Sequence, residues 1–463
     1  MKILSKGNDM KKIGLLSLVA ISALSTLSAA TNSELEQRIE ALEKKLKSTN
    51  TKLMAVKKHD AFDNIKFGVD FRNAIDVLDY KNNETGEEHE NHSLVTSRLY
   101  LTMAASPMDK LTFKGKLAVY NIWGAELYHS EDGPFKSWAG SSKASDTVMR
   151  VKEAYFVYTD AIGEQPISFS IGRRPSTDGY LANYRENVTE SGSPAAHITN
   201  MEVEAAMVKL DWDRFVPGAY SKVVYGRAHA GELEGVYGNS PLGRTPYAEL
   251  DSEDEYVDFL VMPGMLYNDG QYEVMYEWAH IFNTKGKNLS TGEIKIAAGT
   301  ADLYSLSLKV NGIGDEISDF LDETTFFISG AYTNYDADKG YTLIGSSDGG
   351  SESGSSVWTG IIFPDMITEN GKIGLEYNHG SKYWTPMTWA EDTAVGSKIA
   401  VRGDAYEIYW NFDLFGLKYL PSQIRYTYLQ HDYTPNINCA GWVAPQAVDL
   451  ESQDLRFSVS YRY

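Results

Sequence analysis

The end of the chain alternates strictly between two kinds of side chain. Apolar or aromatic residues occupy every second position, at Leu455, Phe457, Val459, Tyr461 and Tyr463, and the residues between them are all polar. Successive side chains of a β-strand point to opposite faces, so this segment is predicted to be a strand with one apolar and one polar face. The same alternation returns along the chain beyond Phe62 and predicts an all-β body.

Turn-forming residues divide this body into sixteen predicted strands. Their approximate ranges are 65–77, 95–105, 111–122, 148–159, 167–173, 202–210, 220–230, 256–266, 271–282, 301–310, 324–334, 357–363, 372–380, 400–412, 423–433 and 453–463. Long and short connections between these strands alternate along the chain. That arrangement is typical of an up-and-down transmembrane barrel, which has tight turns at one end and longer loops at the other.

A sheet inside a membrane must also satisfy its own backbone. Hydrocarbon offers no hydrogen-bond partners, so a spanning sheet has to close on itself. We therefore predict a transmembrane antiparallel up-and-down β-barrel of about 16 strands over residues 61–463, with apolar side chains toward lipid and polar ones around a lumen. A soluble β-sandwich or propeller that buries the same apolar faces is the alternative.

The first thirty residues have the composition of a targeting segment. Lys11 and Lys12 precede an apolar run from Ile13 to Leu27, and small residues follow at 28–30. This order of basic, apolar and small residues predicts a secretory signal peptide over 1–30. The alternative is a transmembrane anchor, but the run is shorter than the roughly 20 residues that a helix needs to cross a bilayer.

Residues 31–60 carry a heptad pattern. Leu35, Ile39, Leu42, Leu46 and Leu53 lie on one seam, and charged residues occupy the other faces. A helix this short does not bury its apolar stripe alone, so the pattern predicts a short coiled-coil helix and a homo-oligomer, with a trimer as the expected form. A single amphipathic helix on the protein's own surface is the alternative.

Composition and missing motifs argue against several functions. The chain has 43 Lys+Arg against 63 Asp+Glu, and a net charge of −20 argues against a nucleic-acid partner, since phosphate binding requires clustered basic residues. One Cys excludes a disulfide framework. No Ser-His-Asp or Cys-His catalytic set is evident from the sequence, so we expect neither an enzyme nor a cofactor. His229, His280 and His431 are the candidates for a catalytic site assembled from separate strands, and His89 with His92 for a shared metal ion.

Four features together resemble bacterial outer-membrane porins: the signal peptide, the heptad segment, the alternating strands and the aromatic end from Phe457 to Tyr463. The stretches 150–155 and 171–175 are similar to paired strands found early in many porins. The sequence of residues 172–179 resembles that of a porin-like family of uncharacterised function.

The resemblance implies a location, partners and an activity. The barrel would lie in outer-membrane lipid with residues 31–60 in the periplasm, and Phe457, Tyr461 and Tyr463 would form the signal that the barrel-assembly machinery reads. The implied activity is that of a porin, a passive diffusion channel for small hydrophilic solutes or ions. The alternative is a structural barrel anchor, or a sheath for a cell-wall, electron-transfer or export partner. A barrel enzyme, a lipase or protease, is the second alternative.

The polar phase of the strands predicts the lining of the lumen. Its charged members are Lys66, Asp70, Arg72, Arg98, Lys114, Lys116, Arg150, Lys152, Arg425, Arg456 and Arg462. Because ten of these eleven residues are basic, we expect a basic wall beneath acidic external loops and a preference for anions. Acidic mouths that concentrate cations would produce the opposite preference.

The longest connection, about residues 174–201, follows the fifth predicted strand. In sixteen-stranded porins the loop at this place commonly folds inward and narrows the pore, and the resemblance implies the same role here. The residues expected at this constriction are Arg174, Asp178, Tyr180, Tyr184, Arg185, Glu186 and Glu190, with His197. An external loop with solvated charges is the alternative.

Overall fold

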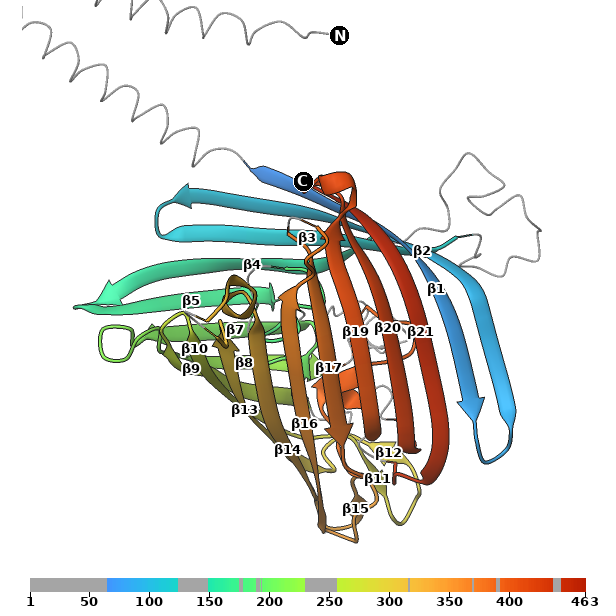
Figure 1. The fold of residues 1–463 in the computed structure, drawn as a ribbon. Helices are drawn as coiled ribbons and strands as arrows, with labels where there is room; N and C mark the ends of the chain where they lie inside the picture. Colours follow the sequence, from blue (N-terminus) through green and yellow to red (C-terminus); the bar gives the residue numbers. More distant parts are fainter. Residues whose placement is uncertain are drawn as a thin grey trace, which may run out of the picture. The chain divides into compact units, whose positions relative to one another are not determined.

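Sixteen antiparallel strands form one closed sheet in the computed structural model (Figure 1). The barrel strands are β1 (Lys66–Asn82), β2 (Glu87–Met108), β3 (Leu111–Ile122), β4 (Met149–Ile162), β5 (Gln165–Arg174), β7 (Val203–Asp211), β8 (Tyr220–His229), β9 (Val257–Asn268), β10 (Tyr272–Ile281), β13 (Gly299–Asn311), β14 (Thr325–Ala337), β16 (Ser351–Pro364), β17 (Lys372–Gly380), β19 (Gly403–Asp413), β20 (Pro421–Tyr433) and β21 (Ala447–Arg462). Each predicted strand corresponds to one of them, so the antiparallel barrel predicted from the sequence is confirmed.

The structure describes residues 65–123, 149–174, 178–188, 192, 194–229, 256–314, 317–368, 370–388, 392–435 and 443–463. They belong to one unit, Ile65–Tyr463. The segments predicted as signal peptide (1–30) and coiled coil (31–60) lie outside the described residues. The helical elements in the described part are α3 (Asp319–Asp322), η3 (Lys398–Ala400) and η4 (Leu414–Gly416). No helix in that part is long and apolar enough to cross a membrane.

The first and last strands close the barrel. β1 pairs with β21 from Asp70 opposite Arg462 to Asn82 opposite Leu450. Val69 and Tyr463 exchange two backbone hydrogen bonds, of 2.8 and 2.9 Å, so the sheet is joined up to the end of the chain. Closure leaves no row of unpaired amide groups along a free edge, which is the condition for a sheet in hydrocarbon.

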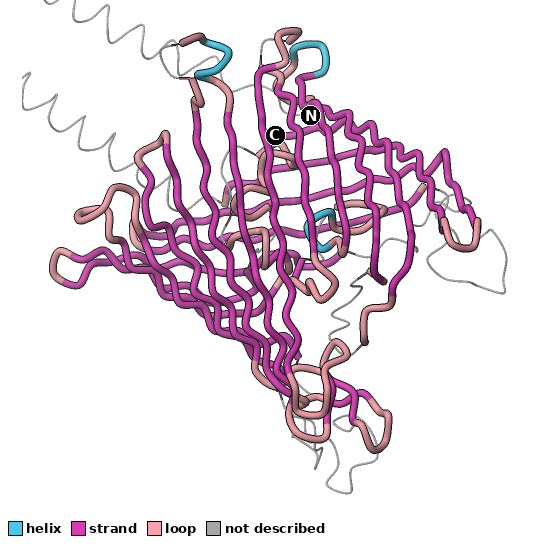
Figure 2. Tube along the Cα trace, turned by 60° about the horizontal axis from the view of Figure 1, so that its bottom comes forward, coloured by secondary structure: helices cyan, strands magenta, loops and turns pink. Residues whose placement is uncertain are grey.

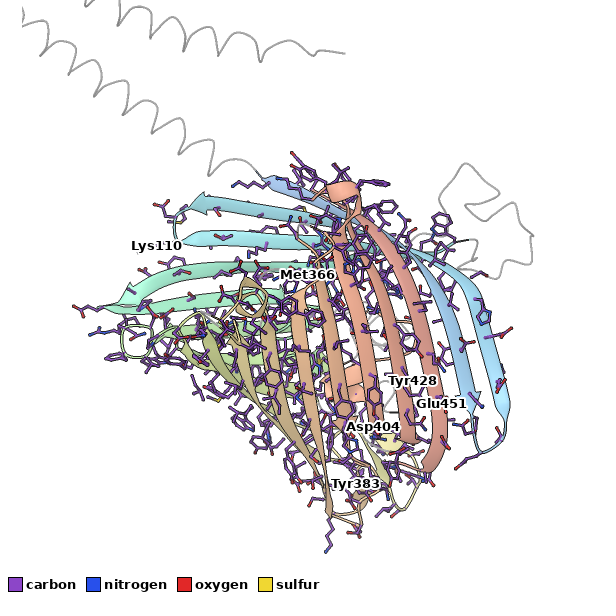
Figure 3. The ribbon with its side chains drawn as sticks, viewed as in Figure 1. Lys110, Met366, Tyr383, Asp404, Tyr428 and Glu451 are labelled. Carbon is purple, nitrogen blue, oxygen red and sulfur yellow. The ribbon has the colours of Figure 1, made fainter. Side chains whose placement is uncertain are left out.

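Connections differ between the two ends of the barrel. The end that carries both barrel termini, here called the terminal end, has the connections 109–110, 163–164, 212–219, 269–271, 312–324, 365–371 and 414–420. The opposite, loop end has 83–86, 123–148, 175–202, 230–256, 282–298, 338–350, 381–402 and 434–446. In Figure 3, Lys110 and Met366 mark turns at the terminal end, and Tyr383 marks the loop end. The predicted alternation of long and short connections is therefore present along most of the chain, but 83–86 at β1–β2 is short, and 338–350 at β14–β16 is no longer than 312–324.

The clearest departure from the prediction is the first hairpin. The sequence predicts a long loop after residue 77, but β1 and β2 continue to a tight turn at 83–86. The extension carries many charged and polar residues and lacks the apolar alternation on which the prediction relied. Cross-strand pairs hold it together, among them Lys81 with Glu88 at 3.5 Å and His92 with Asp79 at 2.9 Å.

Large apolar side chains cover the outside of the sheet, and the inward face carries most of the buried polar ones, together with buried apolar residues such as Leu303 and Phe327 that pack against loops inside the barrel. On β13, Ser305 and Ser307 are buried inside the barrel, whereas Tyr304 and Leu306 are 46% and 56% exposed on the outside. The neighbouring β14 repeats the pattern with Ser329 inside, opposite Ser307. Apolar outward and polar inward faces are the pattern of transmembrane barrels.

The described residues of two connections from the loop end, 178–188, 192 and 194–202 of one and 381–388 and 392–402 of the other, lie inside the barrel (Figure 2). We call residues 175–202 the first inner loop and residues 381–402 the second inner loop. They are joined by a short parallel pair, β6 (Thr199–Asn200) with β18 (Met387–Thr388). A separate small sheet forms from other loop-end connections; its strands are β11 (Gly286–Asn288), β12 (Ile294–Lys295) and β15 (Tyr341–Thr342).

Candidate functional site

The interior of the barrel is the candidate site, and His197 fixes the first inner loop to one side of it. The ring lies 2.7 Å (Nδ1) from the Ser329 hydroxyl and 3.0 Å (Nε2) from the Ser356 hydroxyl, on β14 and β16. It also packs edge-on against Trp358 and Trp384, at 5.8 and 5.5 Å between ring centres. Complete burial lowers the pKa of His197 to about 3, so the ring is neutral at physiological pH.

The same loop is anchored at two more places on the wall. Glu277 of β10 accepts hydrogen bonds from the Ala195 backbone N–H at 2.5 Å and from the Thr199 hydroxyl at 2.7 Å. On the other side of the interior, the side-chain amides of Asn411 and Gln423 donate to the backbone carbonyls of Tyr184 (3.0 Å) and Arg185 (2.6 Å). β10 and β20 are separated by five strands, so the loop crosses the interior of the barrel.

The second inner loop packs against β16 and β17 so closely that only glycine fits. A Cβ on Gly354 would lie 2.3 Å from the Trp384 backbone nitrogen, and one on Gly380 would lie 2.0 Å from the Val401 carbonyl oxygen. Trp384 is fully buried and donates from Nε1 to the Ile399 carbonyl at 2.8 Å. The loop is therefore a packed part of the interior.

Lys398 holds the second inner loop electrostatically. Its ammonium group lies 2.6 Å from Glu376 of β17 and also pairs with Glu407 of β19. All three side chains are buried, so each charge depends on the others for compensation. Removing the lysine would take this counter-ion from Glu376, whereas Glu407 would keep Arg185 at 3.7 Å and Arg425 at 3.9 Å.

Asp392 joins the same loop to a second part of the wall, formed by β21, β1 and β2. Its carboxylate lies 2.5 Å from Arg72, 3.0 Å from Arg98 and 3.6 Å from Arg456. Burial alone would raise the pKa of Asp392, but the three positive charges outweigh burial and hold the pKa well below its ordinary value. The carboxylate is therefore ionised over the physiological range.

The wall is not basic as a whole, and this part of the sequence expectation is wrong. Inward-facing acidic residues pair with the predicted basic ones: Asp76 with Arg456, Asp454 with Arg425 at 3.7 Å, and Glu153 with Lys116. Asp70 itself contacts Arg98 at 3.3 Å and Arg462 at 3.2 Å. Basic groups buried beneath inner loops need counter-charges nearby, because an isolated ion is costly away from water.

The other predicted lumen residues fall into two groups. Lys152 is buried, pairs with Glu202, and lies 5.6 Å above the Tyr100 ring. Lys66, Lys114 and Arg150 occupy the inward phase of their strands but are exposed. The eleven predicted residues thus do not form one continuous cluster.

The residues predicted for a constriction lie mostly on the first inner loop. Tyr180 and Arg185 are buried inside the barrel, and Tyr184 stacks on Phe327 with 6.4 Å between ring centres. Arg185 pairs with Glu186 at 2.7 Å. Arg174 ends β5 and donates to the Ser170 hydroxyl. The pKa of Asp178 is raised, first by burial and then by the charge of Glu186. Glu190 lies outside the described residues.

Sequence reasoning missed the second inner loop, which it treated as external. Its functional side chains are Asp392, Lys398 and Arg402; Arg402 donates to the Trp384 carbonyl at 2.9 Å and to the Thr385 hydroxyl at 2.7 Å. One signal was available. Residues 381–402 contain Trp384, Val395, Ile399 and Val401, an apolar content that a solvated loop does not require.

The residues predicted as an assembly signal face outward at the end of β21. Phe457, Tyr461 and Tyr463 are 42%, 48% and 74% exposed. Tyr419 in the adjoining 414–420 connection lies 6.3 Å from Tyr463 between ring centres. The three residues therefore form part of the apolar outer surface near the terminal end.

The candidate catalytic histidines do not come together. His280 of β10 faces outward, 2.9 Å from the Asp302 carboxylate, whereas His431 of β20 is buried inside the barrel. His229 ends β8, whose neighbours in the sheet are β7 and β9. Side chains on opposite faces of a wall cannot share a substrate, so these histidines do not form the catalytic set considered above.

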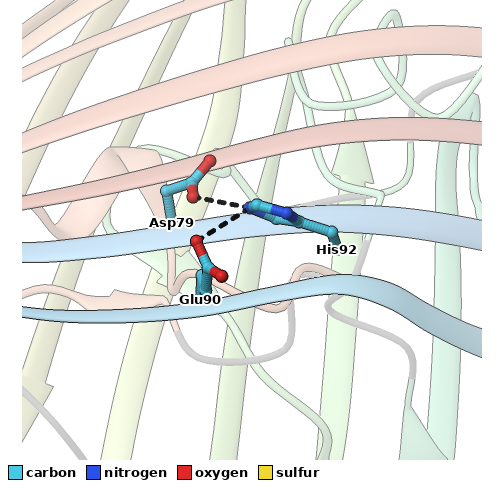
Figure 4. Close-up of side chains that lie close together, drawn as sticks. All are labelled: Asp79, Glu90 and His92. Carbon is cyan, nitrogen blue, oxygen red and sulfur yellow. Dashed lines mark hydrogen bonds and ion pairs between the residues drawn. The ribbon is translucent and has the colours of Figure 1, made fainter.

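At the loop end of the first hairpin, Asp79, Glu90 and His92 converge (Figure 4). The His92 Nε2 atom lies 2.9 Å from an Asp79 oxygen and 3.6 Å from a Glu90 oxygen. His89 pairs instead with Glu87 at 2.9 Å. Residues three apart on a strand point to opposite faces, so the hypothesis of a metal ion shared by His89 and His92 is wrong.

Three solved structures illustrate what the fold is similar to. OprB of Pseudomonas putida, in its high-pH structure, is 12% identical with a TM-score of 0.47, over 90% of this chain and 96% of that one. An anion-selective porin from Comamonas acidovorans is 12% identical with a TM-score of 0.47, over 86% and 99%. The outer membrane channel DcaP of Acinetobacter baumannii is 12% identical with a TM-score of 0.44, over 86% and 97%.

A family match covers most of the barrel. No curated protein sequence matches the chain. A family described as "Protein of unknown function (DUF3373)" matches residues 88–458, a range that begins in β2 and ends in β21. The chain therefore belongs to the DUF3373 family.

Proposed function

We propose that this protein is an outer-membrane channel through which small hydrophilic solutes or ions diffuse passively. The observation that carries the proposal is the reversed polarity of a closed sheet. Leu306 and Ile408 are exposed on the outside, whereas Ser307 and Glu407 on the same strands are buried inside. An outer surface of this kind is stable against acyl chains, and an inner one of this kind suits water and polar solutes.

The two inner loops determine the size and charge of the solutes that can cross the barrel. The first crosses the interior between β10 and β20, and the second is tied to the wall through Asp392 and Lys398. A route narrowed in this way favours small solutes, and charged groups along it rank them by sign. We expect a channel of low conductance for its strand number.

The rivals are an anchor, a sheath and an enzyme. An anchor or sheath does not require a water-filled passage, so it predicts no stepwise current. A lipase or protease requires assembled catalytic groups, and the three candidate histidines lie on separate strands, two of them on opposite faces. The trimer and the periplasmic coil over 31–60 belong to the proposal as expectations from the heptad pattern.

Conductance measurement separates these functions. Purified mature protein reconstituted in a planar bilayer is expected to produce discrete, ohmic current steps. Reversal potential in a salt gradient then gives the sign of the preferred ion. The matched control is the same preparation after heat denaturation, which is expected to be silent. If folded protein that migrates as a heat-modifiable band produces no steps, the channel proposal is wrong.

A further inference from the structure

A polar cavity lies inside the barrel beside the first inner loop. It is bounded by β1, β2, β19, β20 and β21, and by Glu186 and Asn187 of the loop. Its lining residues are Arg72, Arg98, Glu186, Asn187, Asn411, Pro421, Ser422, Gln423, Arg425, Ser458, Ser460 and Arg462. Pro421 begins β20 and Arg462 ends β21, so the cavity is on the side of the terminal end.

Positive charge dominates the lining. Four arginines contribute to it against one acidic residue, Glu186, which already pairs with Arg185 at 2.7 Å. The pKa of Glu186 is lowered because Arg185 and Arg425 outweigh the effect of burial, which alone would raise it. The partner acids Asp70, Asp392, Glu407 and Asp454 contact the same arginines but are not part of this lining.

Three buried donors on the lining residues have no acceptor. The Nε–H groups of Arg72, Arg98 and Arg425 make no hydrogen bond to any residue that the structure describes. These arginines are 7%, 7% and 2% exposed. An unsatisfied buried donor costs about 1–3 kcal/mol, and more when it is charged, so these three lining arginines keep hydrogen-bonding capacity that the described residues do not use.

The chemistry of the donors defines the ligand. Guanidinium groups bind planar carboxylates and phosphates through paired N–H groups. Ser458 and Ser460 add hydroxyl groups to the lining, and the first inner loop adds Glu186 and Asn187. We infer that this cavity is a binding site for a small oxyanion, a carboxylate or a phosphate, on its way through the barrel. The role of this site in transport rests on the proposed function, whereas the binding of an oxyanion does not depend on it.

Calorimetry tests binding without requiring a current. Full-length mature protein in detergent is titrated with succinate, with inorganic phosphate and with uncharged glycerol. We expect succinate, phosphate or both to bind and glycerol not to bind. Succinate alone identifies a carboxylate site, and phosphate alone identifies a phosphate site. If neither anion binds to folded wild-type protein, the inference is overturned.

Variants locate the site. Arg425→Gln is expected to weaken anion binding at least tenfold, and Arg425→Lys to weaken it less because the charge remains. Arg462→Gln, at the more exposed rim, tests the same cavity if the buried substitution impairs folding. Lys418→Gln removes an exposed charge at the same end outside the cavity and is expected to bind as wild type does. Equal binding by wild type, Arg425→Gln and Arg462→Gln would overturn the inference.

Bilayer recordings connect the site to transport. Millimolar succinate or phosphate is expected to reduce chloride current through wild type and to have at least tenfold less potency on Arg425→Gln. If current steps occur but neither oxyanion affects them, the channel function is supported and a role of this site in transport is refuted. Anion binding without any current would keep the site and contradict the channel.

Discussion

Arg72 and Asp392 are 320 positions apart in the chain, yet their side chains form an ion pair inside the barrel, with 2.5 Å between Nη1 and Oδ2. Arg72 belongs to β1, and Asp392 belongs to the second inner loop. Arg98 and Arg456 contact the same carboxylate. One aspartate therefore holds the loop against three strands of the wall.

Asp392→Asn is expected to raise single-channel conductance. The substitution removes the charge that compensates three buried arginines, and breaking a buried ion pair costs about 3–5 kcal/mol. The second inner loop then loses its attachment to β1, β2 and β21. Single-channel recording measures the effect. Glu84→Gln, on the exposed turn 83–86, is the matched control, and identical step sizes in all three proteins would refute the role of Asp392.

Acidification is expected to weaken the attachment of His197. The folded-state pKa of about 3 lies below the unfolded value of about 6.5, so the unfolded state takes up the proton first. The contribution of His197 to stability is complete above about pH 6.5 and falls by about 1.4 kcal/mol per pH unit toward pH 3.

Fluorescence of the neighbouring tryptophans can measure this effect. Denaturant unfolding is followed in wild type and in His197→Gln between pH 7.5 and 4, with Trp358 and Trp384 as local probes. The difference in unfolding free energy between the two proteins should shrink as the pH falls. A difference that stays constant over this range would show that His197 is not the titrating group.

An arginine on the outer face is expected to destabilise the barrel in lipid. Leu306 is in the middle of β13 and exposed on the outside. Leu306→Arg should lower the unfolding free energy in liposomes by about 2–4 kcal/mol, the cost of a basic side chain near the bilayer midplane. Thr85→Arg, in the turn beyond the barrel, should change it by less than about 0.5 kcal/mol. Equal effects of the two substitutions would place Leu306 outside the hydrocarbon.

Removal of residues 31–60 is expected to abolish the trimer and leave the barrel folded. The heptad seam supplies the apolar contact between chains, whereas the closed sheet completes its own hydrogen bonds. Chemical cross-linking in detergent gives the oligomer, and heat-modifiable migration reports the barrel. A truncated protein that still cross-links as the full chain does would assign association to another surface.

The strands could be predicted because lipid and water make opposite demands on neighbouring residues. Leu455, Phe457 and Val459 alternate with polar residues for that reason, and this alternation was enough to predict the strand β21. The interior could not be predicted in the same way. Asp392 meets Arg72 only because the barrel closes between β1 and β21 and the second inner loop folds beneath them. Nothing local in the sequence encodes a contact over 320 positions.

The alternation along each strand predicted which face of the sheet a charged side chain lies on. It did not predict which residue that side chain pairs with. Arg456 and Asp76 both lie on the inward phase, and their pairing depends on the register between β21 and β1. The basic wall was predicted from the arginines and lysines on the inward face, without inward-facing acidic residues such as Asp454. The tight turn at 83–86 was missed because polar cross-strand pairs, with no apolar alternation, extend that hairpin.

The opposite environments of the two faces can be tested on adjacent residues of β7. Val208 faces outward and Lys209 inward, and both are partly exposed. In a Cys439→Ser background, spin labels at Val208→Cys and Lys209→Cys are compared in liposomes for collision with oxygen and with a water-soluble nickel reagent. We predict a label at 208 that meets oxygen in the acyl chains and a label at 209 that meets nickel from water. Nickel accessibility at 208, with oxygen accessibility at 209, would contradict the transmembrane barrel.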